Sequence, residues 1–303
     1  MDLIDGLKQV ADLDVDTHVP MSEHTSFRIG GPADVLVVPH TREALASAVR
    51  LLKEAGQKPI VIGNGTNLLV LDGGIRGVVV KIANGMSRVT VEDDLIIAES
   101  GVRMASLCST CAHHGLGGLE WAAGIPGTLG GALMMNAGAH GGEIGPLTEW
   151  VKTVLPSGEF RTLQRQELTF GYRMSCFQGS PEIIVQAALR LVKDDPAVVH
   201  AKLCDIIETR CEKQPVAMPS AGCVFKRSPG EGAGRLVDWA GCKGMRVGGA
   251  VVSEKHANFI VNEGSATAAE VLKLIEVVRA KVKERFDVDL KTEICILGEP
   301  AEE

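Results

Sequence analysis

A glycine-rich run constrains this chain more than any other feature. Residues 115–145 read GLGGLEWAAGIPGTLGGALMMNAGAHGGEIG, and 11 of these 31 positions are glycine. Glycine loses the most backbone freedom on folding, so the run is poor material for a long helix or strand. It is not a linker either, because Trp121, Leu129, Leu133 and Met134 are interleaved with the glycines and favour burial. We therefore expect a buried backbone that lies close against a large, flat ligand such as a cofactor.

The bulk composition restricts the class of protein. At 303 residues the chain is long for one core, and its 45% hydrophobic and 23% charged residues are typical of a soluble globular protein. The net charge of −7 argues against a nucleic-acid or anionic-membrane partner. The acidic, amphipathic start does not resemble a signal peptide, and no uncharged apolar run reaches the roughly 18 residues of a membrane span. Eight scattered cysteines then favour reduced thiols and a cytoplasmic location.

Periodicity and turn residues predict three consecutive segments. We expect a small α/β part over 1–82, a second part with a hairpin and a half-buried strand over 83–194, and a third part over 195–303. The helix over 41–55 and a long helix that opens with the capping box at 267–270 carry clear helical patterns. Leu290–Leu297 is predicted to be a closing strand.

A CxxC pattern occurs at Cys108 and Cys111. It is not followed directly by histidine in the haem-attachment spacing, and it lies in a helical stretch that ends at Gly115. The pattern therefore favours two small apolar residues on a helix face over a metal or redox site.

A second glycine motif, Gly63-Asn-Gly-Thr-Asn67, lies between two strand-like runs. The Rossmann fingerprint needs GxGxxG opening a helix, whereas here Leu68 takes the sixth position and a strand follows. Such a turn can still hold a diphosphate, because successive backbone N–H groups form an anion-binding nest. Thr66 and Asn67 add side-chain donors, and an ordinary surface turn is the alternative.

Together with motifs further along the chain, these two segments carry a resemblance to a known family. The motifs occur in the order HTSFRIGGPAD, GNGTNLLV, GLEWAAGIPGTLGGALMMNAGAHGGE, GYRMS, PSAGCVFKR, SEKHANFIVN and KTEICILGE. The ordered set covers nearly the whole chain and resembles the UDP-N-acetylenolpyruvoylglucosamine reductases. The resemblance implies an α+β protein with a two-part FAD-binding fold of the vanillyl-alcohol-oxidase type, followed by a C-terminal α/β substrate domain. It also implies a monomer.

The resemblance implies two-electron redox chemistry in peptidoglycan precursor synthesis. NADPH reduces FAD, and flavin N5 then delivers hydride to C3 of the enolpyruvyl ether of UDP-N-acetylglucosamine. Protonation of C2 gives UDP-N-acetylmuramate. The residues implied as cofactor contacts are Gly63, Asn64, Gly65, Thr66, Asn67, Leu68, Gly124, Ile125, Pro126, Thr128, Asn136, Ala137, Gly138 and Ala139.

Hydride arrival at C3 sends negative charge into the substrate carboxylate, so a cation is needed there. Arg173 matches the family's arginine, and its forked guanidinium suits a developing oxyanion. Tyr172, the only tyrosine, precedes it and is expected to contact substrate, although a lone arginine can also be a surface charge. Glu293 matches the carboxylate that the family pairs with this arginine, although a glutamate in a late strand is usually a solvent-facing residue.

Cys223 is a departure from the family pattern. The family's proton donor to C2 is commonly a serine, and here the pattern reads Ser220-Ala-Gly-Cys-Val-Phe225. A thiol with a reference pKa of about 8.5 is a stronger acid than an alcohol. We therefore expect Cys223 to donate the proton, while Ser220 or a water molecule is the alternative donor.

Other charged residues are expected near the substrate. Lys226 and Arg235 are candidates for neutralising the diphosphate. His256, in SEKHANF, is expected to be structural. The short stretch between Arg173 and Pro181 leaves no room for the tyrosine loop of one subclass, so the chain resembles the shorter subclass.

Two other functions are compatible with parts of this pattern. One is an FAD-dependent oxidoreductase of the same fold with another substrate, which would not need a proton donor to carbon. The other is a catalytically silent nucleotide-binding scaffold, which the presence of Arg173, Cys223 and Glu293 disfavours. No His-rich or carboxylate cluster suggests a metal.

Overall fold

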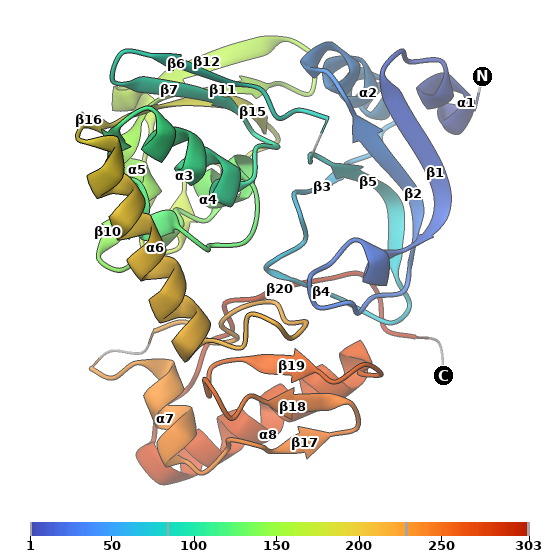
Figure 1. The fold of residues 1–303 in the computed structure, drawn as a ribbon. Helices are drawn as coiled ribbons and strands as arrows, with labels where there is room; N and C mark the ends of the chain where they lie inside the picture. Colours follow the sequence, from blue (N-terminus) through green and yellow to red (C-terminus); the bar gives the residue numbers. More distant parts are fainter. Residues whose placement is uncertain (1, 84, 228–229, 302–303) are drawn as a thin grey trace. The chain divides into compact units, whose positions relative to one another are not determined.

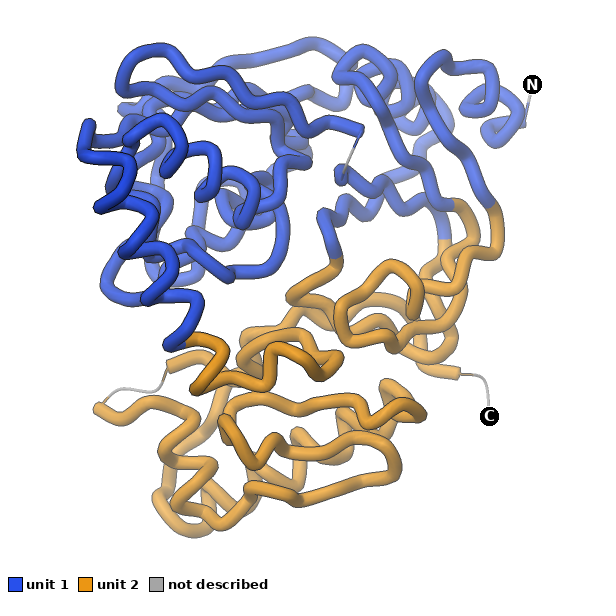
Figure 2. Tube along the Cα trace, in the orientation of Figure 1, with its two compact units in different colours: residues 1–16, 36–64, 77–209 blue, residues 17–35, 65–76, 210–303 orange. Residues whose placement is uncertain are grey.

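The described residues of the computed structural model, which are 2–83, 85–227 and 230–301, form two units. The first contains residues up to 16, 36–64 and 77–209, and the second contains 17–35, 65–76 and 210 onward (Figure 2). Each unit therefore collects stretches that are far apart in the sequence. The three consecutive segments expected from the sequence remain a prediction about domains.

A four-stranded sheet carries the N-terminal part of the fold (Figure 1). Its order is β1 (Leu13–Pro20), β2 (Pro32–Pro39), β5 (Ile75–Lys81) and β3 (Ile60–Ile62), and β3 pairs with β5 in parallel. Helix α1 (Leu3–Lys8) precedes β1, and the expected helix over 41–55 is α2 (Arg42–Glu54). Thr41 caps α2 by accepting a hydrogen bond from the Ala44 amide, at 3.1 Å. The predicted helix is confirmed.

An antiparallel five-stranded sheet forms the other layer of the first unit. Its order is β12 (Phe160–Gln164), β11 (Thr148–Val154), β15 (Ile183–Arg190), β7 (Leu95–Glu99) and β6 (Val89–Glu92). The predicted hairpin is confirmed as β11 and β12, in which Val154 faces Phe160. The core beneath the sheet includes residues of α3 (Met104–His113) and α4 (Leu129–Met134), and it also contains Trp121 from the glycine-rich segment.

Several short elements and one helix of 18 residues, α6, complete the first unit and lead into the second. They are β8 (Leu116–Gly117), β9 (Gly138–Ala139), β10 (Gly142–Glu143), α5 (Ile144–Leu147), β13 (Phe170–Gly171), β14 (Met174–Ser175), β16 (Val192–Lys193) and α6 (Pro196–Lys213). The glycine-rich segment thus folds into strands and helices of only two to six residues, as its glycine content predicts.

The second unit is built on a three-stranded antiparallel sheet and two helices. The sheet order is β17 (Arg246–Val247), β18 (Ala250–Val252) and β19 (Ile260–Asn262), with α7 (Ala233–Trp239) and α8 (Ala268–Phe286) (Figure 1). The predicted capping box is confirmed, because Thr267 accepts from the Glu270 amide and the Glu270 carboxylate accepts from the Thr267 amide. The buried face of α8 includes Leu274 and Val278.

The closing strand is shorter than predicted. Strand β20 covers only Cys295–Leu297, and it pairs in parallel with β4 (Leu68–Val70). Residues 290–294 form no regular ladder, and instead Thr292 makes an isolated bridge with Phe225. The prediction of one strand over Leu290–Leu297 is therefore wrong for its first half, where Glu293 lies.

Within the described part of the chain, no helix combines the length and the apolar character that crossing a bilayer requires.

Candidate active site

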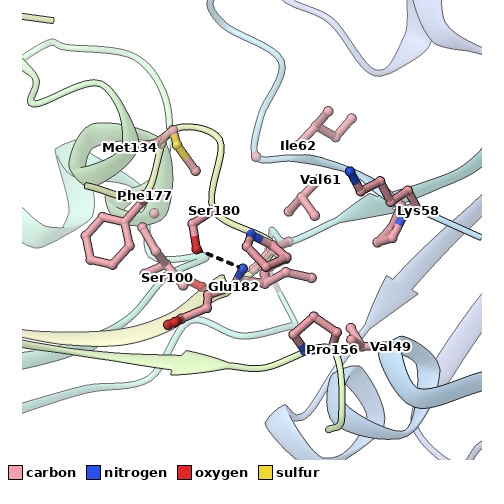
Figure 3. A pocket seen from close by; sticks show the side chains of 18 of the residues that line it. Val49, Lys58, Val61, Ile62, Ser100, Met134, Pro156, Phe177, Ser180 and Glu182 are labelled. Carbon is pink, nitrogen blue, oxygen red and sulfur yellow. Dashed lines mark hydrogen bonds between the residues drawn. The ribbon is translucent and has the colours of Figure 1, made fainter. Parts of the chain in front are cut away.

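A cavity of about 880 Å³ lies in the first unit (Figure 3). This volume falls within the roughly 300–1,000 Å³ that is typical of small-molecule sites. The walls include the end of α2, strand β3, the start of α4 and the loop before β15, and Figure 3 shows Val61, Met134 and Phe177 among the lining side chains. Gly63 and Thr128, both expected to contact the cofactor, are lining residues as well.

The two glycine motifs meet at this cavity. A Cβ atom added to Gly63 would lie 2.5 Å from the Thr128 Oγ1 atom, so no side chain fits between them. In the same wall, a Cβ at Gly130 would lie 3.0 Å from the Ser100 Cβ. The backbone of Gly63 thus lies against the Thr128 side chain, and the motifs at 63–67 and 115–145 meet in the wall of the cavity.

The polar groups of the cavity fit a nucleotide-type cofactor. The Ser100 Oγ atom is buried and has no hydrogen-bond partner among the described residues, and Ser100 lines the cavity. A buried hydroxyl normally has a partner, so a ligand atom is a reasonable acceptor or donor for it. Thr128 Oγ1, in contrast, accepts from the Gly131 amide at 3.4 Å and caps α4.

Asn136, an expected cofactor contact, also makes hydrogen bonds within the protein. Its side chain is buried and donates to the Glu143 carboxylate at 3.0 Å and to the Gly171 carbonyl at 2.9 Å, while it accepts from the Gly145 amide at 3.0 Å. The carboxamide therefore fixes the loop around it. Contacts of the cofactor with Asn136 and the other residues expected over 124–139 remain a prediction.

Arg173 is held at the turn of a two-strand hairpin. Strands β13 and β14 pair Phe170 with Ser175, and Arg173 adopts a left-handed backbone conformation, with φ of 53°, between them. Its Nη1 donates to the Gly138 carbonyl at 3.4 Å, and its guanidinium carbon lies 5.6 Å from the centre of the Tyr172 ring. The structure thus brings Arg173 and Tyr172 to the glycine-rich segment.

Cys223 and Glu293 are brought together in the second unit. The Glu293 amide donates to the Val224 carbonyl at 2.7 Å, so Glu293 pairs with the residue directly after Cys223. Asn67, from the GNGTN motif, donates through Nδ2 to the Glu293 carbonyl at 3.3 Å, and its own carbonyl accepts from the Cys295 amide. The backbone of Glu293 is therefore fixed by two sequence-distant motifs.

A buried guanidinium lies near Cys223, and sequence reasoning missed it. Burial lowers the pKa of Arg210, and the nearby Cys223 and Cys211 side chains partly offset this effect. The Arg210 Nε atom is buried and has no hydrogen-bond partner among the described residues. In the sequence Arg210 reads as one of several charges on α6, so nothing in the pattern distinguishes it.

The two candidate diphosphate ligands have different surroundings. The Lys226 amide donates to the Lys291 carbonyl at 2.8 Å, and the side chain is half-buried. Arg235 is exposed and pairs with Glu231 one helical turn earlier, at 3.1 Å. A substrate role for either residue remains a prediction.

The CxxC pattern is confirmed as part of a helix core. Cys108 and Cys111 are 2% and 1% exposed on α3, and burial raises the pKa of Cys108 to about 12 and that of Cys111 still further. Thiols with such pKa values stay protonated near neutral pH and are poor metal ligands. Among residues 2–83, 85–227 and 230–301, no group of three His, Cys, Asp or Glu side chains is arranged to hold a metal ion.

Two family models match the chain. Residues 33–164 match an FAD binding domain, and residues 214–297 match the C-terminal domain of UDP-N-acetylenolpyruvoylglucosamine reductase. Reductases of that name from Clostridium botulinum (strain 657 / Type Ba4) and Alkaliphilus oremlandii are 45% and 46% identical over 280 residues. Each alignment covers 92% of this chain, and 91% and 92% of the respective relatives.

Solved structures agree with these matches. The crystal structure of UDP-N-acetylenolpyruvylglucosamine reductase from Thermus caldophilus superposes with a TM-score of 0.79 at 34% identity, covering 94% of this chain and 99% of that one. A BBE-like protein from Physcomitrella patens superposes with a TM-score of 0.53 at 16% identity over 64% of this chain and 45% of that one, a likeness of fold alone. The predicted fold class, an FAD-binding domain followed by a C-terminal domain, is confirmed.

Proposed function

Because the chain belongs to the UDP-N-acetylenolpyruvoylglucosamine reductase family, we propose that it reduces the enolpyruvyl ether of UDP-N-acetylglucosamine to UDP-N-acetylmuramate, with NADPH as the electron source. The reaction is a step of peptidoglycan precursor synthesis. We place it in the cytoplasm and expect a monomer, as the family resemblance implies. The observation that carries the proposal is the pairing of Glu293 with the residue next to Cys223.

The cavity residues of the first unit would hold FAD. Gly63 and Gly130 would let the wall of the cavity pack closely against Thr128 and Ser100, and the Ser100 hydroxyl would bond one of the polar atoms of FAD. When bound, FAD would supply the two-electron chemistry that moves hydride from NADPH to C3 of the substrate. The Gly65–Leu68 stretch is proposed to contribute backbone N–H groups to the cofactor diphosphate.

Three side chains would carry the rest of the reaction. Arg173 would bind the substrate carboxylate, where negative charge develops as C3 receives hydride, because its planar guanidinium gives two parallel hydrogen bonds. Cys223 would donate its thiol proton to C2, and the resulting thiolate would have the Arg210 cation nearby. Glu293 would orient the carboxylate end of the substrate or assist proton transfer. Tyr172, Lys226 and Arg235 would contact the sugar nucleotide.

The proposal is tested by following each half-reaction without oxygen. The purified protein should carry visible flavin absorbance, NADPH should bleach it, and the enolpyruvyl sugar nucleotide should restore it. If the reduced protein is not reoxidised by this substrate, the proposed function is wrong. A scaffold protein would show no flavin, and another oxidoreductase of this fold would be reduced but not reoxidised by the enolpyruvyl compound.

The proton donor is tested with two variants of Cys223. Cys223→Ala should leave flavin reduction by NADPH nearly intact and slow reoxidation by about 10²–10⁴-fold, the usual contribution of a general acid. Cys223→Ser, which restores the hydroxyl donor common in the family, should retain more activity than the alanine variant. Normal reoxidation by Cys223→Ala would show that Ser220 or water donates instead.

A further inference from the structure

The SEKHANF motif has no role in the reaction as proposed so far, yet its polar groups form a connected network. The Ser253 hydroxyl accepts from the Lys255 and His256 amides, at 3.2 and 3.4 Å. His256 Nδ1 accepts from the Asn258 amide at 3.2 Å. Burial lowers the pKa of His256, and the Lys243 charge adds to the effect, so the ring is neutral and can accept at Nδ1. These hydrogen bonds hold the backbone of the motif in place up to Asn258.

Asn258 makes three hydrogen bonds with the two residues that follow Cys223. Its Oδ1 accepts from the Phe225 amide and its Nδ2 donates to the Phe225 carbonyl, both at 2.9 Å. Its backbone carbonyl accepts from the Val224 amide at 2.8 Å. The Asn258 side chain is 6% exposed and Phe225 is 2% exposed, so water does not compete for these bonds. The Asn258 carboxamide takes the place of a neighbouring strand here, because it bonds both the amide and the carbonyl of Phe225.

The opposite edge of the same segment faces Glu293. The Val224 carbonyl accepts from the Glu293 amide at 2.7 Å, and the Lys226 amide donates to the Lys291 carbonyl at 2.8 Å. Cys223 forms an isolated bridge with Phe259. The segment 223–226 is therefore held between Asn258 on one edge and the Glu293 backbone on the other, without a regular ladder.

The geometry points to Asn258 as the positioning residue for the proton donor: its carboxamide fixes the backbone at Phe225 and thereby sets where Cys223 lies relative to Glu293. This inference rests on the proposed function, in which Cys223 gives its proton to C2. Without the carboxamide, the buried Phe225 amide and carbonyl would lose their partners, which is costly for backbone groups that water does not reach. The segment would shift to recover them. A general acid must lie within hydrogen-bond reach of its target, so such a shift removes proton transfer.

The test replaces the carboxamide and compares the two half-reactions. Asn258→Leu, which is close in size and makes neither bond, should slow reoxidation of the reduced flavin by the enolpyruvyl sugar nucleotide by about 100-fold, the effect of a displacement near 1 Å. Flavin reduction by NADPH should change less than about twofold, since it does not use Cys223. The solvent deuterium isotope effect on reoxidation should rise, because proton donation becomes the slow step.

A second asparagine provides a matched control. Asn262 is 3% exposed, donates through its side chain to the Phe27 carbonyl at 3.1 Å and accepts from the Gly264 amide at 2.8 Å. Asn262→Leu should lower the free energy of unfolding as Asn258→Leu does, but it should leave the isotope effect at the wild-type value. Asn258→Asp keeps the acceptor for the Phe225 amide, so it should slow reoxidation less than Asn258→Leu does. It replaces the leucine variant in the test if Asn258→Leu does not fold.

The outcomes separate this inference from the proposed function. If wild-type protein is not reoxidised by the enolpyruvyl compound, the proposed function fails. A different result would overturn only the positioning role. In that case the wild-type protein is reoxidised, and Asn258 variants that are folded and loaded with flavin show the wild-type rate and the wild-type isotope effect. An equal rise of the isotope effect in Asn262→Leu would also overturn it, because the effect would then report general loosening.

Discussion

Gly63 lies close to Thr128 in the wall of the cavity, and Gly63→Ala tests the importance of this contact. The new Cβ would lie 2.5 Å from Thr128 Oγ1, about 0.9 Å short of ordinary contact. Overpacking of this kind costs about 1–3 kcal/mol. Because Thr128 Oγ1 also caps α4, the side chain cannot rotate away without losing its bond to the Gly131 amide. We expect Gly63→Ala to lower the free energy of unfolding by about 2 kcal/mol and to weaken FAD retention.

A double-mutant cycle isolates the steric cause. Thr128→Ala alone should cost about 1 kcal/mol, as for other helix caps. In that background the 2.5 Å contact with Oγ1 is removed and the Cβ of residue 128 lies at an ordinary 3.5 Å, so the second change should cost little. The double variant should therefore be about 1–2 kcal/mol more stable than the sum of the single changes predicts.

The assay is urea unfolding of the flavin-free protein, together with the dissociation constant of FAD. Gly131→Ala is the control for replacing glycine in the same segment, because its Cβ would lie 3.7 Å from the same Thr128 oxygen, and helix propensity favours alanine there. It should not lower the free energy of unfolding. Additivity of the two single changes within about 0.5 kcal/mol would refute the steric reasoning.

Two further predictions concern titratable groups. His256 is neutral in the fold because burial lowers its pKa, whereas the unfolded chain binds a proton near the ordinary pKa of 6.5. The free energy of unfolding should thus decrease as pH falls through about 6.5, and His256→Asn, which retains an acceptor for the Asn258 amide, should flatten this part of the pH profile in urea unfolding. An unchanged profile would contradict the assignment. In the native protein at pH 8, Cys108 and Cys111 should resist alkylation while the exposed Cys204 reacts, as peptide mapping by mass spectrometry would show.

The sequence predicted correctly those helices whose stabilising features lie close together in the chain. Helix α2 and helix α8 each combine an apolar face with a capping threonine within a few residues, so one stretch of sequence contains the whole signal. The strand predicted over Leu290–Leu297 failed because an apolar run cannot reveal whether its partners form a ladder. Its first half instead meets residues 224–226 through single hydrogen bonds.

The candidate site was predictable only in part, for a related reason. The glycine run indicated close backbone approach, but its partner, Gly63, lies more than 50 residues earlier and was linked to it through family resemblance. Asn258 was missed because a single asparagine in an apolar run gives no sign of the chain it bonds. Segments of the two units alternate along the sequence, so domain boundaries placed one after another along the chain cannot describe these units.

The irregular backbone around Cys223 has a functional consequence. Isolated bridges join Cys223 to Phe259 and Phe225 to Thr292, whereas a regular sheet would distribute the same constraint over many hydrogen bonds. The position of Cys223 therefore depends on a few bonds from Asn258 and Glu293. Replacing serine by cysteine at this position changes the acid but leaves those bonds intact, because they involve the backbone of the following residues. The fold can thus accept cysteine or serine at residue 223, whereas loss of the Asn258 carboxamide should displace the segment.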